Sequence, residues 1–347
     1  MPAPAIGVAV SGGVDSLVAA FLIKQQFKQV FGLHFTTGYE IHKPDINRLK
    51  DQLNMDIFTL DLSAPFEKEV IGYFVSTYFH GKTPNPCMVC NQKIKFGVLL
   101  DRAKKLGADY LATGHYAAIV NALTQPDARP QPPRLEKAKD TNKDQSYFLA
   151  RLSRDQLASI LCPLSGFTKD QVRALAAEHG LVPVFGRESQ DVCFMNDKNL
   201  ADFFTDKTGL TSQPGPIIDT HGRRVGTHAG VHAFTVGQRR GLNCPASEPY
   251  YVRQIDPATR TLHVCFKKDL AVQQMAVEQM VWHDDRPEAV REVAVKIRYR
   301  HKETGATLTC QGTTGRVTFR TPQYAVTPGQ TAVFYQDRQV LGSAIIQ

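Results

Sequence analysis

The stretch AVSGGVDS, residues 9–16, joins an apolar run that begins at Ile6 to the apolar segment SLVAAFLIKQQF, residues 16–27. The first run has the composition of a buried strand, and the second that of a helix lying against a sheet. Two adjacent glycines at the junction let the backbone turn tightly and aim several N–H groups into one concavity. The stretch therefore predicts a strand, an anion-binding turn and a helix at the start of an α/β fold.

The turn suits a pyrophosphate, and it differs from the two common nucleotide-binding loops. It lacks the lysine of G-x-x-x-x-G-K-[ST] and the spacing of G-x-G-x-x-G. Ser11 and Ser16 add hydroxyl donors, and the N-terminus of the following helix adds positive potential. Asp15 is placed to hold Mg²⁺ on the phosphates. An ordinary glycine turn between a strand and a helix is the alternative.

The rest of the first half alternates between strand-like and helix-like segments. Strands are expected at 29–35, 55–60 and 108–116, and helices at 46–53 and 65–79. Residues 93–107 are expected to continue a helix that begins after the Pro-Asn-Pro segment at 84–86 and stops at Gly107. Two further helices are expected at 145–161 and 168–180, the second with Thr168 as its N-cap and Gly180 as its stop. This alternation predicts a parallel sheet with helices on both faces.

The second half has a different character. After about residue 205 the helical periodicity gives way to short alternating segments separated by Gly, Pro, Asp and Asn, which is typical of small β domains. A break near residues 275–285 divides this half. We therefore expect an α/β domain at 1–204, a central β-rich domain at 205–278 and a C-terminal β-barrel at 279–347.

Length and composition set outer limits on the function. A chain of 347 residues is long enough for two or three domains. The formal net charge of +8 suggests a polyanionic partner such as nucleic acid without requiring one. The N-terminus has no basic segment typical of a signal peptide, and no apolar run has the length of a membrane span. The odd number of cysteines, seven, indicates reduced thiols and hence a cytoplasmic protein.

Two cysteine segments are candidates for chemistry. GKTPNPCMVCN, residues 81–91, places Cys87 and Cys90 on one face of an expected helix N-terminus, which should lower the pKa of both thiols and favour thiolate. ESQDVCF, residues 188–194, supplies Cys193. The alternative for a C-x-x-C pair is half of a structural zinc site, but the sequence lacks a second pair. The other cysteines are interpreted as packing residues: Cys162, Cys244, Cys265 and Cys310.

Taken together, these stretches resemble the tRNA-specific 2-thiouridylase family, within the N-type ATP pyrophosphatases. The resemblance covers nearly the whole chain and includes, in the family's order, AVSGGVDS, GKTPNPCMVCNQKIKFG, GADYLATGHY, KDQSYFLARL, ESQDVCF, VGQRRGL, VKIRYR and TPGQTAVFY. It implies that ATP is split between its α and β phosphates, that O2 of the tRNA wobble uridine is adenylated, and that sulfur then replaces this oxygen. The turn at residues 11–13 would hold the leaving pyrophosphate.

The resemblance also implies roles for individual residues. Cys193 would carry the incoming persulfide, and Cys90 would resolve it by forming a disulfide. A cysteine desulfurase relay or sulfide would supply the sulfur. The nucleotide would be bound by Ala9, Val10, Ser11, Gly12, Gly13, Val14, Asp15, Ser16, Phe35 and Gly114. The tRNA would be contacted by His115, Lys143, Asp144, Gln145, Arg298, Tyr299 and Gln330.

The sequence departs from the family pattern in two places. Many members have aspartate where this chain has Cys87, so the role of this position is open. The segment 36–81 is short and lacks an acidic insert, which leaves the geometry of ATP binding open there. Two sulfur-transfer mechanisms stay open: a persulfide relay, or a [4Fe-4S] cluster held by Cys87, Cys90 and Cys193.

Basic segments of the second half suggest a nucleic-acid surface. In VKIRYRHK, residues 295–302, a strand would place Lys296, Arg298 and Arg300 on one face as a row that follows phosphates. A solvated basic strand is the alternative. GQRRGL, residues 237–242, and HGRRVG, residues 221–226, add arginine pairs in glycine turns. The target uridine should be flipped out of its stack to reach the catalytic pocket.

Three other functions compete with uridine 2-thiolation. A tRNA thiolase could act on a different base, and a synthetase of the same superfamily could amidate a small carboxylate or carbonyl substrate, although amidation needs no thiol. A third possibility is an RNA-binding protein with a vestigial nucleotide fold, whose cysteines hold a structural metal. Residues 185–195 have the composition of a loop that could move Cys193 toward Cys90.

Overall fold

The computed structural model describes residues 3–124, 132–184, 192–195, 199–209, 213–283 and 289–347. Residues 185–195 were predicted from their composition to form a loop that could move Cys193. Of these, residues 185–191 lie outside the described residues. No helix among the described residues combines the length and the apolar character that crossing a membrane requires.

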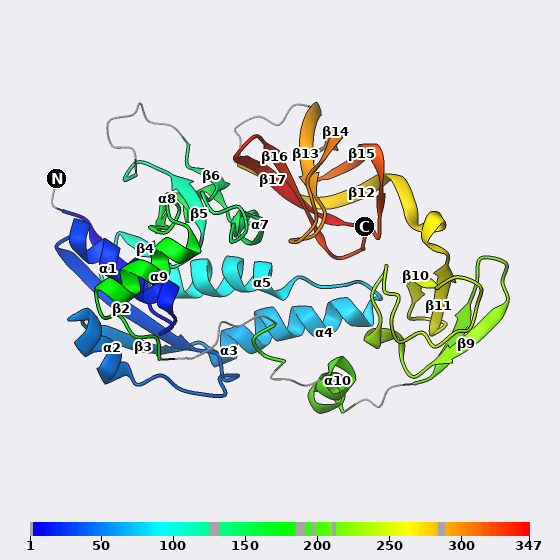
Figure 1. The fold of residues 1–347 in the computed structure, drawn as a ribbon, viewed down its shortest axis with the longest axis horizontal. Coiled ribbons are helices and arrows are strands. Elements are labelled where there is room, and N and C mark those ends of the chain that lie inside the picture. Colours follow the sequence, from blue (N-terminus) through cyan, green and yellow to red (C-terminus); the bar gives the residue numbers. More distant parts are fainter. Residues whose placement is uncertain (1–2, 125–131, 185–191, 196–198, 210–212, 284–288) are drawn as a thin grey trace.

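A parallel sheet forms the centre of the N-terminal region (Figure 1). Its described strands lie in the order β3-β2-β1-β4-β7, and every neighbouring pair is parallel. The strands are β1 (Ala5–Ala9), β2 (Gln29–Thr36), β3 (Ile57–Asp61), β4 (Tyr110–Ala112) and β7 (Ile160–Leu161). Strands β2 and β3 lie on one side of β1, and β4 lies on its other side. The carboxyl ends of β1 and β4 therefore flank a topological switch point, where open α/β sheets bind ligands.

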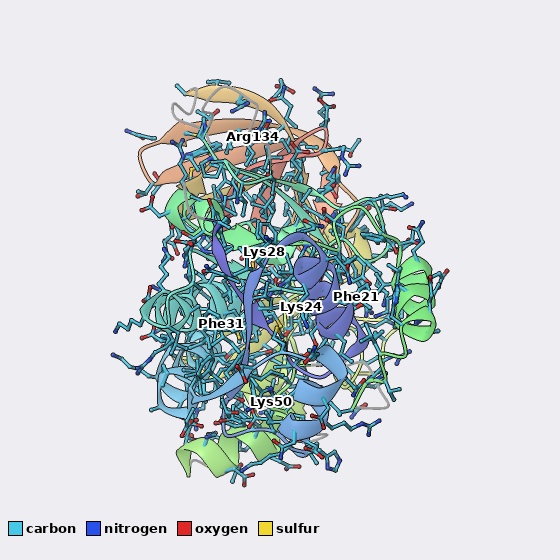
Figure 2. The ribbon with its side chains drawn as sticks, turned by 90° about the vertical axis from the view of Figure 1, so that its left-hand side faces the viewer. Phe21, Lys24, Lys28, Phe31, Lys50 and Arg134 are labelled. Atoms are coloured by element: carbon cyan, nitrogen blue, oxygen red, sulfur yellow. The ribbon has the colours of Figure 1, made fainter. Side chains whose placement is uncertain are left out.

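Helices cover both faces of this sheet, as predicted. On one face, α1 (Val14–Gln26), α2 (Ile46–Leu53) and α9 (Lys169–Glu178) bury Leu17, Leu49 and Val172 in a common core. Phe21 of α1 stacks on His179 just after α9, with ring centroids 4.2 Å apart, and Lys24 donates to Leu53 O at 2.5 Å (Figure 2). These contacts join the three helices into one layer.

The opposite face carries a longer run of helical segments. They are α3 (Ser63–Phe66), the π-helical η1 (Glu67–Ile71), α4 (Gly72–Phe79), α5 (Pro86–Val89), the π-helical η2 (Cys90–Leu99) and α6 (Leu100–Lys105). Phe66, Phe74, Phe96 and Leu99 bury their side chains in a second core between these segments and the sheet. The helix expected to begin at the Pro-Asn-Pro segment starts at Pro86, where Asn85 is the N-cap and accepts from Met88 N. Cys90 is the first residue of the π-helical stretch, a form common at functional sites.

Local signals placed α9 correctly but did not show where the helix before it is interrupted. Thr168 and Gln171 form the capping box of α9, and Gly180 ends the segment with φ at +63°. The predicted helix at 145–161 is divided into α7 (Ser146–Leu149), α8 (Arg154–Ala158) and strand β7. A further helix, α10 (Leu200–Thr208), follows the Cys193 segment.

The second half is mainly β structure, and the predicted fold class is confirmed. Among the described residues, a small sheet pairs its strands in the order β10-β11-β8-β9. Its elements are β8 (Gly215–Ile218), β9 (Arg224–His228), η3 (Val231–Ala233), β10 (Tyr251–Asp256), β11 (Thr261–Cys265) and η4 (Lys267–Leu270). It encloses its own apolar core around Ile217, Val252 and Leu262.

A larger antiparallel sheet completes the C-terminal region. It contains β12 (Ala271–Trp282), β13 (Val290–Lys296), β14 (Thr304–Gln311), β15 (Thr314–Tyr324), β16 (Thr331–Gln336) and β17 (Gln339–Ile346). Strand β12 pairs with both β15 and β17, which curls the sheet around a core. A hairpin from the first half, β5 (Ala117–Val120) and β6 (Arg134–Lys137), joins this sheet through β17. The catalytic region and the C-terminal barrel therefore share backbone hydrogen bonds.

The predicted division at 204/205 and 278/279 remains a prediction. Strand β12 runs across the second position, and its pairing belongs wholly to the C-terminal sheet. We propose that the second boundary lies near residue 270, between η4 and β12.

The strand prediction for residues 295–302 is wrong beyond Lys296. Strand β13 ends there, and the chain turns through residues 297–301. Arg298 consequently lies half-buried against other loops, so Lys296, Arg298 and Arg300 do not form a row on one strand face. Alternation over a few residues could not reveal this turn, because a turn can carry the same pattern.

Candidate active site

The loop Ser11–Gly13 leaves the carboxyl end of β1 and enters α1, as predicted. Ser16 organises it: its hydroxyl oxygen accepts from Ser11 N and Gly12 N, each at 3.2 Å, and donates to Gly13 O at 2.8 Å. Ser11 Oγ lies 3.2 Å from Ser16 Oγ, and Gly12 has φ of +88°. The Ser16 hydroxyl was expected to face the phosphates, but it holds the loop in shape. Ser11 is exposed and borders the concavity.

Asp15 has a cationic partner that sequence reasoning missed. Lys169 Nζ lies 2.8 and 2.9 Å from the two carboxylate oxygens, and the Tyr116 hydroxyl donates to Oδ1 at 2.7 Å. Lys169 is only 5% exposed, whereas the Asp15 side chain is 32% exposed, so the cation is shielded from water and the carboxylate stays accessible from solvent. The two residues are 154 positions apart, and Lys169 carried no signal beyond its place at the start of a capped helix. The loop thus has a buried positive charge beside its carboxylate.

Gly114, which follows β4, lies directly against the start of α1. A Cβ at this position would come within 2.8 Å of Asp15 C and 3.0 Å of Ser16 N. Those atoms are backbone and could not move aside cheaply. Only glycine therefore lets the loop after β4 approach the phosphate loop this closely.

Phe35 occupies the carboxyl end of β2, on the neighbouring side of β1. It is half-buried and packs on the core beneath α3 to α6. Leu33 O accepts from Val10 N at 2.8 Å, which keeps the end of β2 beside the phosphate loop. The preceding residue of β2, His34, is buried, and its Nδ1 is hydrogen-bonded to Val10 O at 2.9 Å. The residues predicted to bind the nucleotide thus converge on one edge of the sheet.

The predicted catalytic cysteines also come together. Cys87 lies in α5 and Cys90 starts η2, while Cys193 belongs to a segment about a hundred residues later. Cys90 packs on the same apolar core as Val192 and Phe194, the residues that flank Cys193. The thiols of all three cysteines influence one another electrostatically, and none is in a disulfide. Cys87 and Cys193 are exposed, and Cys90 is partly buried.

The prediction that the helix N-terminus lowers the thiol pKa values is wrong for this arrangement. Loss of water around the sulfur atoms raises the pKa of Cys87 and Cys193, and raises that of Cys90 to about 12. The cation of Lys95 opposes this shift at each of the three thiols. Lys95 has no carboxylate partner among the described residues. The three thiols are therefore protonated and lie near a cation for which the described residues supply no carboxylate.

Phe194 anchors the Cys193 segment. It is 3% exposed and lies within a cluster of rings formed with Tyr39, Phe66, Phe74 and Phe203, at centroid distances from 5.0 to 6.1 Å. The neighbouring cysteine is exposed, so the anchor presents the thiol at the surface of the core.

Polar contacts hold helix α10 against the aromatic cluster around Phe194. Lys207 pairs with Glu67 at 2.9 Å and lies over the Tyr39 ring, 4.8 Å from its centroid. The Tyr39 hydroxyl donates to Glu67. The chain on the carboxyl side of Cys193 is therefore fixed to η1 by both aromatic and ionic contacts.

His115 lies between the phosphate loop and the thiols. It follows Gly114, its Nδ1 is 2.8 Å from Thr113 Oγ1, and its ring is 5.6 Å from that of Phe96 on η2. Burial, together with the Lys95 cation, holds its pKa well below 6.5, so the ring is neutral. The loop at 113–115 thus connects the two halves of the site.

The described side chains around the thiols do not form a site for a single metal ion. Among the described residues, which include Cys87, Cys90 and Cys193, no group of three or more His, Cys, Asp or Glu side chains is arranged to hold a metal ion. Magnesium bound to nucleotide phosphates requires only one or two protein carboxylates, and Asp15 fits that need.

Family models match the chain in three consecutive parts. The tRNA methyl transferase HUP domain matches residues 4–197, the tRNA methyl transferase PRC-barrel domain matches residues 203–266, and the aminomethyltransferase beta-barrel domain matches residues 272–346.

Similar proteins share the full length of the chain. The tRNA-specific 2-thiouridylase MnmA of Desulfosudis oleivorans is 50% identical over 347 residues, covering 99% of this chain and 95% of the relative. The chain belongs to the tRNA-specific 2-thiouridylase family. The proteins of the same name from Geobacter metallireducens and Acidothermus cellulolyticus are 38% and 39% identical, over 98% and 97% of this chain and 96% of each relative.

Solved structures give weaker likenesses. NMN synthetase from Francisella tularensis aligns with 60% of this chain and 74% of its own, at 15% identity and a TM-score of 0.35. A likeness of this size supports no conclusion about fold or function.

Several residues that the 2-thiouridylase resemblance assigns to tRNA contact are engaged within the protein. Arg298 donates to Val236 O at 2.9 Å, to Ala325 O at 3.1 Å and to Thr327 Oγ1. Gln330 donates to Pro84 O at 2.8 Å, just before the cysteine helix. These bonds fix the central domain and the Pro-Asn-Pro segment to the C-terminal barrel.

The residues at 143–145 are similarly placed. Asp144 is 6% exposed and accepts from Ala138 N at 2.9 Å and Ser146 Oγ at 2.7 Å. Gln145 Oε1 accepts from Tyr116 N at 2.9 Å, while Lys143 is half-buried. The Tyr299 ring packs against that of Phe148, with centroids 4.4 Å apart and the planes tilted by 38°. The contacts with tRNA that the resemblance predicts for this family stay predictions.

Proposed function

We propose that this protein catalyses the ATP-dependent 2-thiolation of the wobble uridine of tRNA. The observation that carries the proposal is the meeting of Cys90 and Cys193 on one core, joined to the phosphate loop by residues 113–115. Activation of a carbonyl oxygen and delivery of sulfur are the two chemical needs of thiolation, and this arrangement provides for both in one cleft. The full-length match to 2-thiouridylases supports it.

ATP would be held at the carboxyl ends of β1, β2 and β4. The residues proposed for this are Ala9, Val10, Ser11, Gly12, Gly13, Val14, Asp15, Ser16, Phe35 and Gly114, and Lys169 adds a cation. Bound ATP supplies an AMP group that converts uridine O2 into a good leaving group. The N-terminus of α1 and Lys169 stabilise the negative charge of the departing pyrophosphate. Asp15 would share its carboxylate between Lys169 and magnesium.

Sulfur would travel through Cys193 as a persulfide. Its terminal sulfur bonds to C2 of the adenylated base, and AMP leaves with the O2 oxygen. The Cys90 thiolate attacks Sγ of Cys193, the sulfur–sulfur bond breaks, and the terminal sulfur stays on C2 as the thiocarbonyl. The products are 2-thiouridine and a Cys90–Cys193 disulfide. This relay needs only Cys90 and Cys193, and a [4Fe-4S] cluster held by these two residues and Cys87 is the alternative.

Anaerobic purification with iron and acid-labile sulfide assays tests the choice of mechanism. An active, colourless and iron-free protein supports the relay, whereas activity that follows cluster content contradicts it.

The tRNA would lie across the cleft between the catalytic region and the β-rich half. We propose that Arg298, Gln330, Asp144 and Gln145 shape this surface through the bonds they make inside the protein, and that His115, Lys143 and Tyr299 lie at its border. A flipped uridine must pass between the phosphate loop and the thiols to be adenylated and then thiolated. Action on tRNA accords with a cytoplasmic location.

The test is deletion of the gene in its host, followed by digestion of total tRNA and mass spectrometry of each thiolated nucleoside. Loss of 2-thiouridine derivatives, restored by the wild type but not by Cys193→Ala or Asp15→Ala, is the expected result. Cys310→Ser, a change within the barrel, is the matched control and should restore them. Loss of another thionucleoside instead would show that the protein acts on a different base. An unchanged profile in a host without a redundant enzyme would refute tRNA thiolation.

A further inference from the structure

The proposed reaction uses Cys90 and Cys193 and leaves Cys87 without a role. Cys87 is nevertheless the exposed member of the C-x-x-C pair and belongs to the same electrostatic group as the other two thiols. The reaction also leaves a Cys90–Cys193 disulfide, which must be opened before Cys193 can be loaded again. A free thiol beside a disulfide is the arrangement in which exchange occurs.

The geometry of the cysteine helix favours a bond between Cys87 and Cys90. Helical geometry puts Cα atoms three residues apart at about 5 Å, within the range that a disulfide accepts. Asn85 caps the helix and Pro86 occupies its first position. Cys87 therefore lies in the first turn, and Cys90 begins the helical stretch that follows it directly. The pair is therefore held close at every stage of the cycle.

The location of the three cysteines gives the exchange a direction. Cys87 and Cys90 lie on one helical stretch, whereas Cys193 lies on a segment about a hundred residues later in the chain and is exposed. A disulfide that moves from Cys193 to Cys87 lies within this helical stretch, and Cys193 is released to its sulfur donor.

We propose that Cys87 resets the enzyme after each turnover by thiol–disulfide exchange, an inference that rests on the proposed function. The Cys87 thiolate attacks Sγ of Cys90, a Cys87–Cys90 bond forms and the Cys90–Cys193 bond breaks. The electron pair leaves on Cys193, which takes up a proton, so the exchange itself consumes no reductant. An external dithiol, of a protein or a small molecule, then reduces the Cys87–Cys90 disulfide by two electrons.

The test is a single turnover of the full-length enzyme with ATP, tRNA and a persulfide donor, without added reductant. The reaction is stopped with acid and an alkylating agent, and the disulfide-linked peptides are identified by mass spectrometry. In the wild type, the Cys87–Cys90 disulfide should exceed the Cys90–Cys193 disulfide about ten-fold, because the helix holds the pair together. In Cys87→Ser and Cys87→Ala, the Cys90–Cys193 disulfide should accumulate.

A second readout is the amount of free Cys193 thiol after the single turnover, before any reductant is added. We expect Cys193 to be mostly free in the wild type and about ten-fold less free in both Cys87 variants, because the exchange is the step that releases it. Cys310→Ser, which alters a thiol of the barrel, should behave as the wild type in both readouts.

The outcomes separate the inference from the function on which it rests. If thiolated tRNA forms in the first turnover but the wild type retains the Cys90–Cys193 disulfide, the exchange is refuted and the proposed function stands. If no thiolated tRNA forms at all, both are refuted. Identical disulfide patterns in the wild type and Cys87→Ser would also overturn the exchange.

Discussion

The phosphate loop and the thiol cleft occupy neighbouring parts of one domain but are built in different ways. The loop is local: Ser11, Gly12, Gly13 and Ser16 bond to one another within six residues. The cleft joins a helix near residue 90 to a segment near residue 193, and ring packing around Phe194 maintains it. A local hydrogen-bonded loop can form whenever its strand and helix form, whereas the cleft requires the surrounding core to be complete.

This difference implies that the two half-reactions can be separated by mutation. Changes around Asp15 should affect adenylation, and changes around Phe194 should affect sulfur transfer. The loop at 113–115 contacts both the phosphate loop and Phe96 on η2, so it is a place where the separation should fail.

Lys169→Met should have the largest effect. It removes the buried cation 2.8 Å from Asp15, and the pyrophosphate then faces a carboxylate without compensation. We expect tRNA-dependent pyrophosphate release to fall about 100-fold or more, the usual cost of removing one positive group from a charged transition state. Alkylation of the cleft thiols should be unaffected. Arg173→Met, an exposed change on the same helix, is the control, and equal pyrophosphate release by the two variants would contradict the role of Lys169.

Gly114→Ala should impair adenylation and sulfur transfer together. Its Cβ would meet Asp15 backbone atoms at 2.8 Å, so the loop at 113–115 must move by a fraction of an ångström or more. Displacements of this size cost up to about 100-fold in rate, so we expect both pyrophosphate release and sulfur transfer to fall by about 10- to 100-fold. Gly166→Ala, where the new Cβ meets nothing within 4 Å, is the matched control. A selective loss of one half-reaction would disprove the connecting role of the loop.

Phe194→Ala should impair sulfur transfer alone. The side chain is 3% exposed, and truncating a buried Phe typically lowers the free energy of unfolding by about 3–5 kcal/mol. Here the loss should fall mainly on the packing that holds the Cys193 segment in place. We expect the rate of 2-thiouridine formation to fall about 10-fold while pyrophosphate release stays near that of the wild type. Phe79→Ala, at a ring that is 41% exposed, serves as the control. If pyrophosphate release fell equally, the two regions would not be independent.

Lys95→Met should have the smallest effect, and it tests whether this cation acts on the Cys90 thiol. Its cation lowers the pKa of the Cys90 thiol against the larger effect of burial, so its loss should raise that pKa further. Alkylation of Cys90 by iodoacetamide at pH 9 should slow by about three- to ten-fold. Lys93→Met, exposed on the same helix, is the control. Equal rates in both variants would show that Lys95 does not act on the thiol.

The pH dependence of the wild type follows from the same shift. With a pKa of about 12, the alkylation rate of Cys90 should rise with pH and reach no plateau below about pH 11. Burial favours the protonated thiol in the folded state, so this contribution to stability is complete below the unfolded pKa of about 8.5 and is lost as the pH rises toward 12. A plateau near pH 8 in stopped-flow alkylation would contradict the burial of this thiol.

The course of the chain through the α/β region could be predicted because its signals are local. Apolar runs mark β1, β2 and β3, and the capping box at Thr168 and the left-handed Gly180 delimit α9. The site was predictable where residues close in sequence act together, as in the phosphate loop. The basic strand at 295–302 failed because a turn after Lys296 interrupts an alternation that continues in the sequence.

By itself, the sequence determined the strand–turn–helix unit at residues 5–26, the spacing of Cys87 and Cys90 on one helix, and the change to β structure after residue 205. Those features depend on side chains within a few turns of one another. Only the tertiary structure decided that Lys169 pairs with Asp15, that Cys193 joins Cys90, and that the cysteine thiols are protonated. Pairing across 100 residues or more, and loss of water around a charge, depend on which segments pack together, and no local pattern carries that information.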